Sequence, residues 1–234
     1  MDHLAGGWSV IAWDGPGCGR SDDPRPGAGL ADHARILGGF VDELGLDQPH
    51  VLGQSWGAVL ALEVQRQRPM LARSLVLAAA YAGWTGSLPP DVVTARLEAA
   101  VAGVLTMDAS AVAAAWLPTL LSASAPAETV RRLGSIVADF HRDASIDMLR
   151  ALAAADLRPV LPTIIAPTLI IHGRQDTRSP LAVATAMRQA IPGARLEILD
   201  DVGHVLHMEA PDRFDTTVAR FLASVEAPRT TLPD

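Results

Sequence analysis

Residues 53–57 read G-Q-S-W-G, a G-x-S-x-G pattern that limits what this chain can fold into more than any other stretch. The short apolar run at 49–52 is typical of a buried strand, and residues 58–66 are rich in strong helix formers. Ser55 is therefore predicted on a sharp strand-to-helix turn. Such a turn crowds the backbone, so glycine is expected two residues to either side, and the serine hydroxyl is held clear. By spacing alone, an ordinary serine in a glycine-rich turn fits equally well.

Composition excludes several classes of protein. The 234 residues are 49% hydrophobic, which suits one domain with a sizeable core and an inserted cap. The net charge is -7 without a run of lysine or arginine, so no nucleic-acid surface is expected. No apolar run approaches the roughly 18–20 residues of a membrane span, and residues 1–7 lack the order of a signal peptide. We expect a cytoplasmic protein with a small-molecule substrate and no membrane partner.

Cys18 is the only cysteine, which excludes an internal disulfide and a multi-cysteine metal site and fits a reducing compartment. The surrounding loop, residues 14–22, holds three glycines and a proline, but its spacing does not match a phosphate-binding loop. Nothing near Cys18 in the sequence supplies the base that a nucleophilic thiol needs, so a structural role is predicted. No metal and no cofactor are expected.

Apolar runs alternate with segments of helical period along most of the chain. The predicted strands are 8–13, 49–52, 73–80, 168–172 and 195–199. Outside the cap described below, the predicted helices are 30–44, 58–66, 146–157, 182–191 and 211–222. Helices between apolar strands indicate parallel strands joined by right-handed crossovers, which is the α/β class.

Residues 84–144 differ from the rest, because they are rich in alanine, helical in period and interrupted by prolines. We interpret them as an inserted helical cap of three or four short helices, with residues 1–83 and 145–234 forming the core. Trp84 and Trp116 could line a substrate pocket beneath this cap, although tryptophans at helical spacing also serve as packing. His141 is expected on the surface of the cap.

Two further polar side chains follow predicted strands. Asp176 comes just after the strand at 168–172, and ligands of open α/β sheets bind along that edge; capping the next helix is the other interpretation. His204 lies in a loop after the last strand. His207, three residues later, is the competing candidate for a catalytic histidine.

The chain order of Ser55, Asp176 and His204 leads to a resemblance. The sequence resembles the α/β-hydrolase superfamily, and especially its serine esterases, enol-lactonases and proline iminopeptidases. The resemblance covers nearly the whole chain outside the cap and rests on G-Q-S-W-G at 53–57, D-G-P-G-C-G-R-S-D at 14–22, P-T-L-I-I-H-G-R-Q-D at 167–176 and G-H-V-L-H-M-E-A-P at 203–211. It implies the α/β-hydrolase fold, with a mostly parallel sheet flanked by helices.

The resemblance also implies roles for individual residues. Ser55 would be the nucleophile, His204 the base that takes its proton, and Asp176 the carboxylate that orients the imidazole. The backbone N–H of Trp56 would donate to the oxyanion. The substrate would be a small carboxylic ester or lactone, cleaved through an acyl-enzyme.

Two alternatives stay open. The serine turn with its tryptophan resembles proline iminopeptidases, but residues 115–119 offer no glutamate to hold a free amine. A non-catalytic binding protein that keeps the pocket is the second alternative. Serine at position 55, where aspartate would be needed, argues against dehalogenase or epoxide-hydrolase chemistry.

The N-terminal region departs from the family pattern. The family's first three strands, and the histidine-glycine loop that supplies a second oxyanion donor, have no counterpart in this sequence. The third strand normally lies between those predicted here at 8–13 and 49–52, about 4.8 Å from each. Either these two strands pair directly, or the natural protein continues about 25–40 residues upstream of Met1; we expect the second, and therefore an N-terminally incomplete core.

Overall fold

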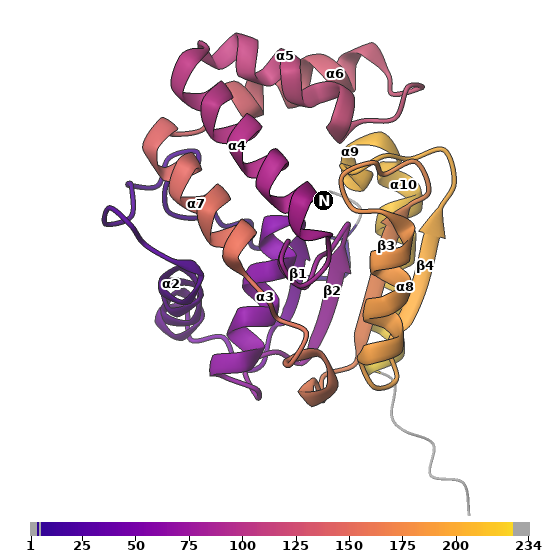
Figure 1. The fold of residues 1–234 in the computed structure, drawn as a ribbon. Helices are drawn as coiled ribbons and strands as arrows, with labels where there is room; N and C mark the ends of the chain where they lie inside the picture. Colours follow the sequence, from indigo (N-terminus) through magenta and orange to yellow (C-terminus); the bar gives the residue numbers. More distant parts are fainter. Residues whose placement is uncertain (1–3, 5, 227–234) are drawn as a thin grey trace, which may run out of the picture.

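The computed structural model describes residue 4 and residues 6–226, and its centre is one parallel sheet (Figure 1). In this part of the chain the sheet has four strands in the order β1-β2-β3-β4, with every neighbouring pair parallel. They are β1 (His50–Gln54), β2 (Ser74–Ala78), β3 (Thr168–Gly173) and β4 (Arg195–Leu199). The predicted α/β class with a mostly parallel sheet flanked by helices is confirmed.

The helices beside the sheet form where the sequence predicts them. They are α2 (Leu30–Glu43), α3 (Trp56–Gln67), α8 (Leu181–Ala190) and α10 (Pro211–Glu226). A 3-10 turn, η1 (Leu161–Thr163), precedes β3, and a short helix, α9 (Leu206–Glu209), precedes α10. Gly45 follows α2 with a φ of 62°, a left-handed conformation that glycine adopts at little cost and that ends the helix.

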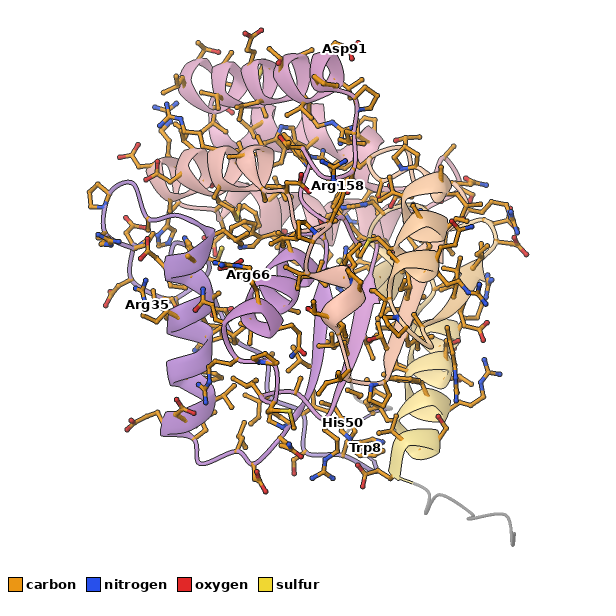
Figure 2. The ribbon with its side chains drawn as sticks, turned by 60° about the horizontal axis from the view of Figure 1, so that its bottom comes forward. Trp8, Arg35, His50, Arg66, Asp91 and Arg158 are labelled. Atoms are coloured by element: carbon orange, nitrogen blue, oxygen red, sulfur yellow. The ribbon has the colours of Figure 1, made fainter. Side chains whose placement is uncertain are left out.

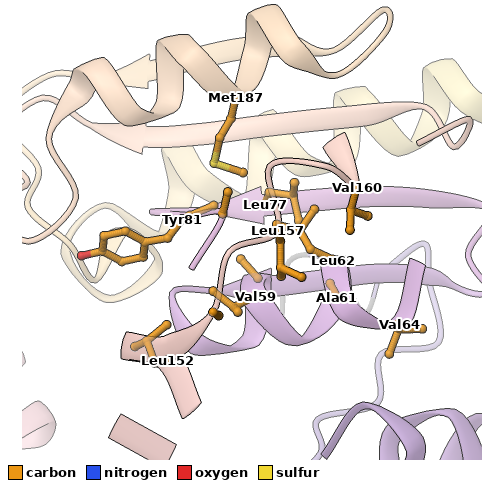
Figure 3. Close-up of a cluster of buried hydrophobic side chains, with 14 of the residues drawn as sticks. Val59, Ala61, Leu62, Val64, Leu77, Tyr81, Leu152, Leu157, Val160 and Met187 are labelled. Atoms are coloured by element: carbon orange, nitrogen blue, oxygen red, sulfur yellow. The ribbon is translucent and has the colours of Figure 1, made fainter. Parts of the chain in front are cut away.

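Alternate residues of the central strands face two separate apolar clusters. Leu75 and Leu77 of β2 belong to the cluster that includes α3 and α8, whereas Val76 belongs to the cluster that includes α10. This period of two buries both faces of the sheet and gives three layers. Figure 3 shows side chains of α3, such as Leu62, packed toward Leu77. Each leucine is fully buried, which stabilises the fold by about 1.5–3 kcal/mol per side chain.

The first strand of the sheet lies at its edge. Among the described residues β1 pairs with β2 alone, and Leu52 is 45% exposed. The prediction of a buried strand at 49–52 is therefore wrong in its burial, because one side of β1 has no neighbouring strand in this part of the chain. The strand's position in sequence is as predicted.

The predicted strand at 8–13 is also wrong, because these residues form no strand. Residues 9–12 are exposed, and Val10 and Ile11 are 39% and 50% accessible. An apolar run becomes a strand only when a partner satisfies its backbone groups, and none lies beside it among the described residues. The ring of Trp8 instead packs edge-on against that of His50, with ring centroids 5.2 Å apart. Figure 2 shows the two residues close together. Of the two alternatives for the N-terminal region, direct pairing of residues 8–13 with β1 does not form among the described residues.

Four helices between β2 and β3 cover the carboxyl ends of the strands (Figure 1). They are α4 (Pro90–Thr106), α5 (Ala109–Leu120), α6 (Ala127–Ala138) and α7 (Arg142–Ala154). Helix α5 packs on α6, and α4 packs on α7. Helix α7 is continuous across residues 144–145, where the sequence predicts the cap to end. In the described residues, no helix combines the length and apolar character that crossing a membrane requires.

Candidate active site

Ser55 lies on the turn between β1 and α3 in a strained backbone conformation, with φ 51° and ψ −112°. Its N–H donates to the carbonyl of Ala78 at 2.9 Å, which ties the turn to the end of β2. A Cβ at Gly53 would lie 2.3 Å from the carbonyl oxygen of Gly57, so glycine is required there. A Cβ at Gly57 would meet nothing within 4 Å. The expectation that both glycines are needed sterically is therefore right for Gly53 alone.

Trp56 is the first residue of α3, where backbone N–H groups have no acceptor inside the helix. Its amide therefore lies at the positive end of the helix dipole, directly after Ser55. The indole ring packs edge-on against His33, with ring centroids 5.5 Å apart. The oxyanion role of the Trp56 amide remains a prediction.

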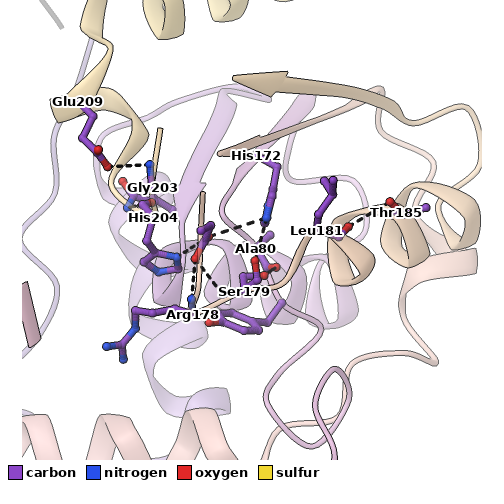
Figure 4. Close-up of polar contacts among 12 residues, drawn as sticks. Ala80, His172, Arg178, Ser179, Leu181, Thr185, Gly203, His204 and Glu209 are labelled. Atoms are coloured by element: carbon purple, nitrogen blue, oxygen red, sulfur yellow. Dashed lines mark hydrogen bonds and ion pairs between the residues drawn. The ribbon is translucent and has the colours of Figure 1, made fainter. Parts of the chain in front are cut away.

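Asp176 lies in the loop after β3, and its carboxylate accepts three hydrogen bonds. Oδ1 accepts from the backbone N–H groups of Arg178 at 2.8 Å and Ser179 at 2.9 Å. Oδ2 accepts from Nδ1 of His204 at 2.7 Å (Figure 4). Burial raises the pKa of Asp176, but the hydrogen bonds from His204 and Ser179 outweigh it, so the pKa lies below its usual range. The carboxylate is therefore ionised at neutral pH.

His204 is 2% exposed and follows β4 in the loop that leads to α9. Because Asp176 accepts at Nδ1, the proton of the neutral ring is on Nδ1 and Nε2 is left as an acceptor. The side chain of Gln54, which precedes Ser55, donates to the His204 carbonyl at 3.0 Å. This contact holds the serine turn beside the histidine loop. The Ser55 hydroxyl and His204 form no hydrogen bond with each other in the described part of the chain. Catalytic hydrogen bonds of this kind are often long until substrate binds.

Glu209 fixes the histidine loop to the end of α5. One carboxylate oxygen accepts from the backbone N–H of Gly203 at 3.0 Å (Figure 4). The other accepts from the backbone N–H of Ser122 at 2.9 Å. The backbone N–H of His204 donates to the carbonyl of Leu120 at 3.0 Å, next to this clamp. Sequence reasoning assigned Glu209 no role, because its partner Ser122 is 87 residues away and no local pattern marks the pair.

The competing histidine lies elsewhere. His207 is an exposed residue of α9, and its ring centroid is 6.0 Å from that of Phe214. The structure thus pairs Asp176 with His204 and leaves His207 on the outer surface.

His172, at the end of β3, is a buried neighbour that sequence reasoning also missed. Its Nε2 donates to the carbonyl of Ser179 at 2.8 Å and lies 4.0 Å from Oδ2 of Asp176. Burial lowers the pKa of His172, so the ring is neutral at pH 7. Its hydrogen bond to Ser179 therefore helps to hold the 176–179 loop, and it does not replace His204 as the hydrogen-bond donor to Oδ2 of Asp176.

The two tryptophans of the cap occupy different surroundings. Trp116 borders a cavity of about 270 Å³ between the cap helices. Its other lining residues are Val104, Met107, Asp108, Ala109, Val112, Val137, Phe140, Arg142 and Ser145. Trp84 is 1% exposed in the main core cluster and does not border this cavity. Ser55 and His204 do not line it either, so the substrate-binding roles of both tryptophans stay predictions.

The described residues contain no group of three or more histidine, cysteine, aspartate or glutamate side chains that could hold a metal ion. Burial and the nearby Asp14 raise the pKa of Cys18, which keeps its thiol protonated and a weak nucleophile. His141, predicted on the surface, is partly exposed and hydrogen-bonds through Nδ1 to Asp23 at 2.6 Å.

Comparison with known proteins identifies the family of this chain. The family described as "alpha/beta hydrolase fold" matches residues 1–211. A 2-hydroxymuconate semialdehyde hydrolase of Pseudomonas putida is 34% identical, covering 93% of this chain and 78% of the relative. A 2-hydroxy-6-oxononadienedioate/2-hydroxy-6-oxononatrienedioate hydrolase of Klebsiella pneumoniae is 30% identical, covering 93% and 77%. The crystal structure of a hydrolase from Pseudomonas aeruginosa is 28% identical with a TM-score of 0.84, covering 94% and 82%.

The serine turn, the buried Asp–His pair and these matches together define the class: the chain belongs to the α/β-hydrolase family.

Proposed function

We propose that this chain hydrolyses a small carboxylic ester or lactone through a covalent acyl-enzyme on Ser55. The observation that carries the proposal is the buried 2.7 Å hydrogen bond between Asp176 and Nδ1 of His204. It leaves Nε2 free to accept a proton, and the contact from Gln54 holds the serine turn against the same loop. A serine hydroxyl is a weak nucleophile without such a base.

The proposed mechanism follows from these positions. Ser55 Oγ attacks the carbonyl carbon of the ester while its proton passes to Nε2 of His204. The ionised Asp176 stabilises the imidazolium that forms, and the Trp56 amide donates to the oxyanion. His204 then protonates the leaving alcohol, and the acyl group stays on Ser55. A water molecule, activated by the same nitrogen, releases the acid and restores the serine.

The test is release of 4-nitrophenol from 4-nitrophenyl butyrate. We expect Ser55→Ala and His204→Ala to lose at least about 10³-fold in kcat, because the nucleophile and its base act as a unit. The matched control is Ser135→Ala, an exposed serine of α6 that should keep full activity. Turnover by Ser55→Ala equal to that of the unmodified protein would rule the mechanism out, and activity lost in His207→Ala but kept in His204→Ala would reassign the base.

A second candidate is hydrolysis of a carbon–carbon bond, which the two relatives at 30–34% identity favour. The compounds in their names contain no ester, so water can split them only at a carbon–carbon bond. Consumption of 2-hydroxymuconate semialdehyde with formation of a 2-hydroxydienoate, in preference to ester turnover, would establish this reaction. If the protein turns over a prolyl anilide, and blocking the N-terminus of that substrate abolishes the turnover, the aminopeptidase alternative is favoured. If the protein binds a substrate without turning it over, the non-catalytic alternative is favoured.

A further inference from the structure

Next to the Asp176–His204 pair lies an arginine, Arg178, to which the proposed mechanism gives no role. Arg178 follows Asp176 by two residues, and its backbone N–H donates to Asp176 Oδ1 while His204 donates to Oδ2 (Figure 4). One carboxylate therefore positions both the imidazole and the residue that carries the guanidinium.

The guanidinium of Arg178 is held by uncharged groups. Its Nη1 donates to Oγ1 of Thr119 at 2.9 Å, and it lies 5.8 Å above the ring of Trp116. Among the described residues it forms no ion pair with a carboxylate, since Asp176 bonds to the backbone and to His204. Most of its five N–H donors are thus available to a ligand. Arg178 is partly buried, and burial is the main cause that lowers its pKa, while the nearby Asp176 acts in the opposite direction.

A second arginine converges on the same place from the cap. Nη1 of Arg96, in α4, donates to the backbone carbonyl of Arg178 at 2.9 Å and lies 3.4 Å from the hydroxyl of Tyr81. Its guanidinium sits 5.3 Å above the ring of Trp84 and likewise forms no ion pair in the described part of the chain. The Tyr81 ring is in turn 6.3 Å from the ring of His204. The fold thus places the positive charges of Arg96 and Arg178 near each other and near His204. Their repulsion costs free energy, which an anionic ligand between them would offset.

We infer that Arg178, supported by Arg96, binds a carboxylate of the substrate beside His204, so the substrate is an ester or lactone that carries a second, ionised acid group. The inference rests on the proposed function and deepens it by naming the substrate class. A planar guanidinium matches a carboxylate through two parallel hydrogen bonds, which fixes orientation as well as affinity.

The experiment compares two nearly isosteric esters, mono-4-nitrophenyl glutarate and its methyl ester, which differ in the terminal charge. We expect unmodified protein to favour the free acid at least about 10-fold in kcat/KM. Arg178→Gln should reduce that ratio about 10- to 100-fold, and Arg178→Lys should retain part of the preference. The matched control is Arg174→Gln, an exposed arginine in the same loop that pairs with Asp200 and should leave the ratio unchanged.

A second measurement does not depend on turnover. Titration calorimetry with glutarate should show binding that Arg178→Gln weakens at least about 10-fold. The inference is overturned if unmodified protein shows no preference for the acid, if Arg178→Gln lowers both esters equally, or if glutarate does not bind. Should Arg178→Gln fail to fold, the preference and the glutarate binding of the unmodified protein decide. Failure of the proposed function gives a different result, because Ser55→Ala would then hydrolyse both esters as fast as the unmodified protein.

Discussion

Replacing Glu209 with glutamine tests whether the clamp between the cap and the histidine loop contributes to stability. Each oxygen of Glu209 accepts one backbone N–H, from Gly203 and from Ser122. Glutamine keeps one oxygen and presents an NH₂ group to the other donor, which leaves that N–H without an acceptor. An unsatisfied partly buried donor costs about 1–3 kcal/mol. We therefore expect a loss of about 2 kcal/mol, equivalent to a fall in Tm of about 4–8 °C for a chain of this size.

The assay is urea and thermal unfolding followed by circular dichroism, together with ester turnover. The matched control is Glu128→Gln, whose carboxylate pairs with Arg131 on the exposed side of α6 and should change stability by less than about 0.5 kcal/mol. Turnover by Glu209→Gln should fall as well, because His204 adjoins Gly203. If Glu209→Gln were as stable as its control, the clamp would contribute nothing, and our account of how the histidine loop is held would be wrong.

Three further predictions concern the candidate site. Gly53→Ala should destabilise the protein by more than about 2 kcal/mol and abolish turnover, because its Cβ would lie 2.3 Å from a backbone oxygen; equal Tm values would contradict this. Asp176→Asn should lower kcat about 10⁴-fold, as in the serine-protease example of this substitution, by forcing His204 into the other tautomer; retained activity would exclude the orienting role. The pKa of Asp176 is lower in the folded protein than in the unfolded chain. The stability that the ionised carboxylate contributes should therefore be full above about pH 4 and be lost as the pH falls through the lower, folded-state pKa. The free energies of unfolding of Asp176→Asn and of the unmodified protein should accordingly become equal in acid.

The sequence was sufficient for the parts of the fold that depend on local patterns. Apolar runs and helical spacing located β1 to β4 and the four helices beside them. Because parallel strands end at one edge of the sheet, the positions of Asp176 and His204 after β3 and β4 predicted that the two would meet. The 2.7 Å hydrogen bond between them shows that they do.

Features that depend on distant partners were not predictable in the same way. The run at 8–13 has strand-like residues, but its conformation is decided by whether another strand lies beside it, which no local pattern reports. Glu209 and Ser122, or Gln54 and the His204 carbonyl, meet only after the cap and the loops have been placed. Arg178 resembles any charged loop residue in the sequence, and only the fold shows that Arg96 lies beside it and that its guanidinium bonds to Thr119 and not to a carboxylate.

The most direct test of the central claim is mass spectrometry of protein quenched in acid during turnover of 4-nitrophenyl butyrate. The account predicts an adduct with the mass of one butyryl group on the peptide that contains Ser55, absent from Ser55→Ala. Turnover without any such adduct, or an adduct located on another residue such as Cys18, would contradict it.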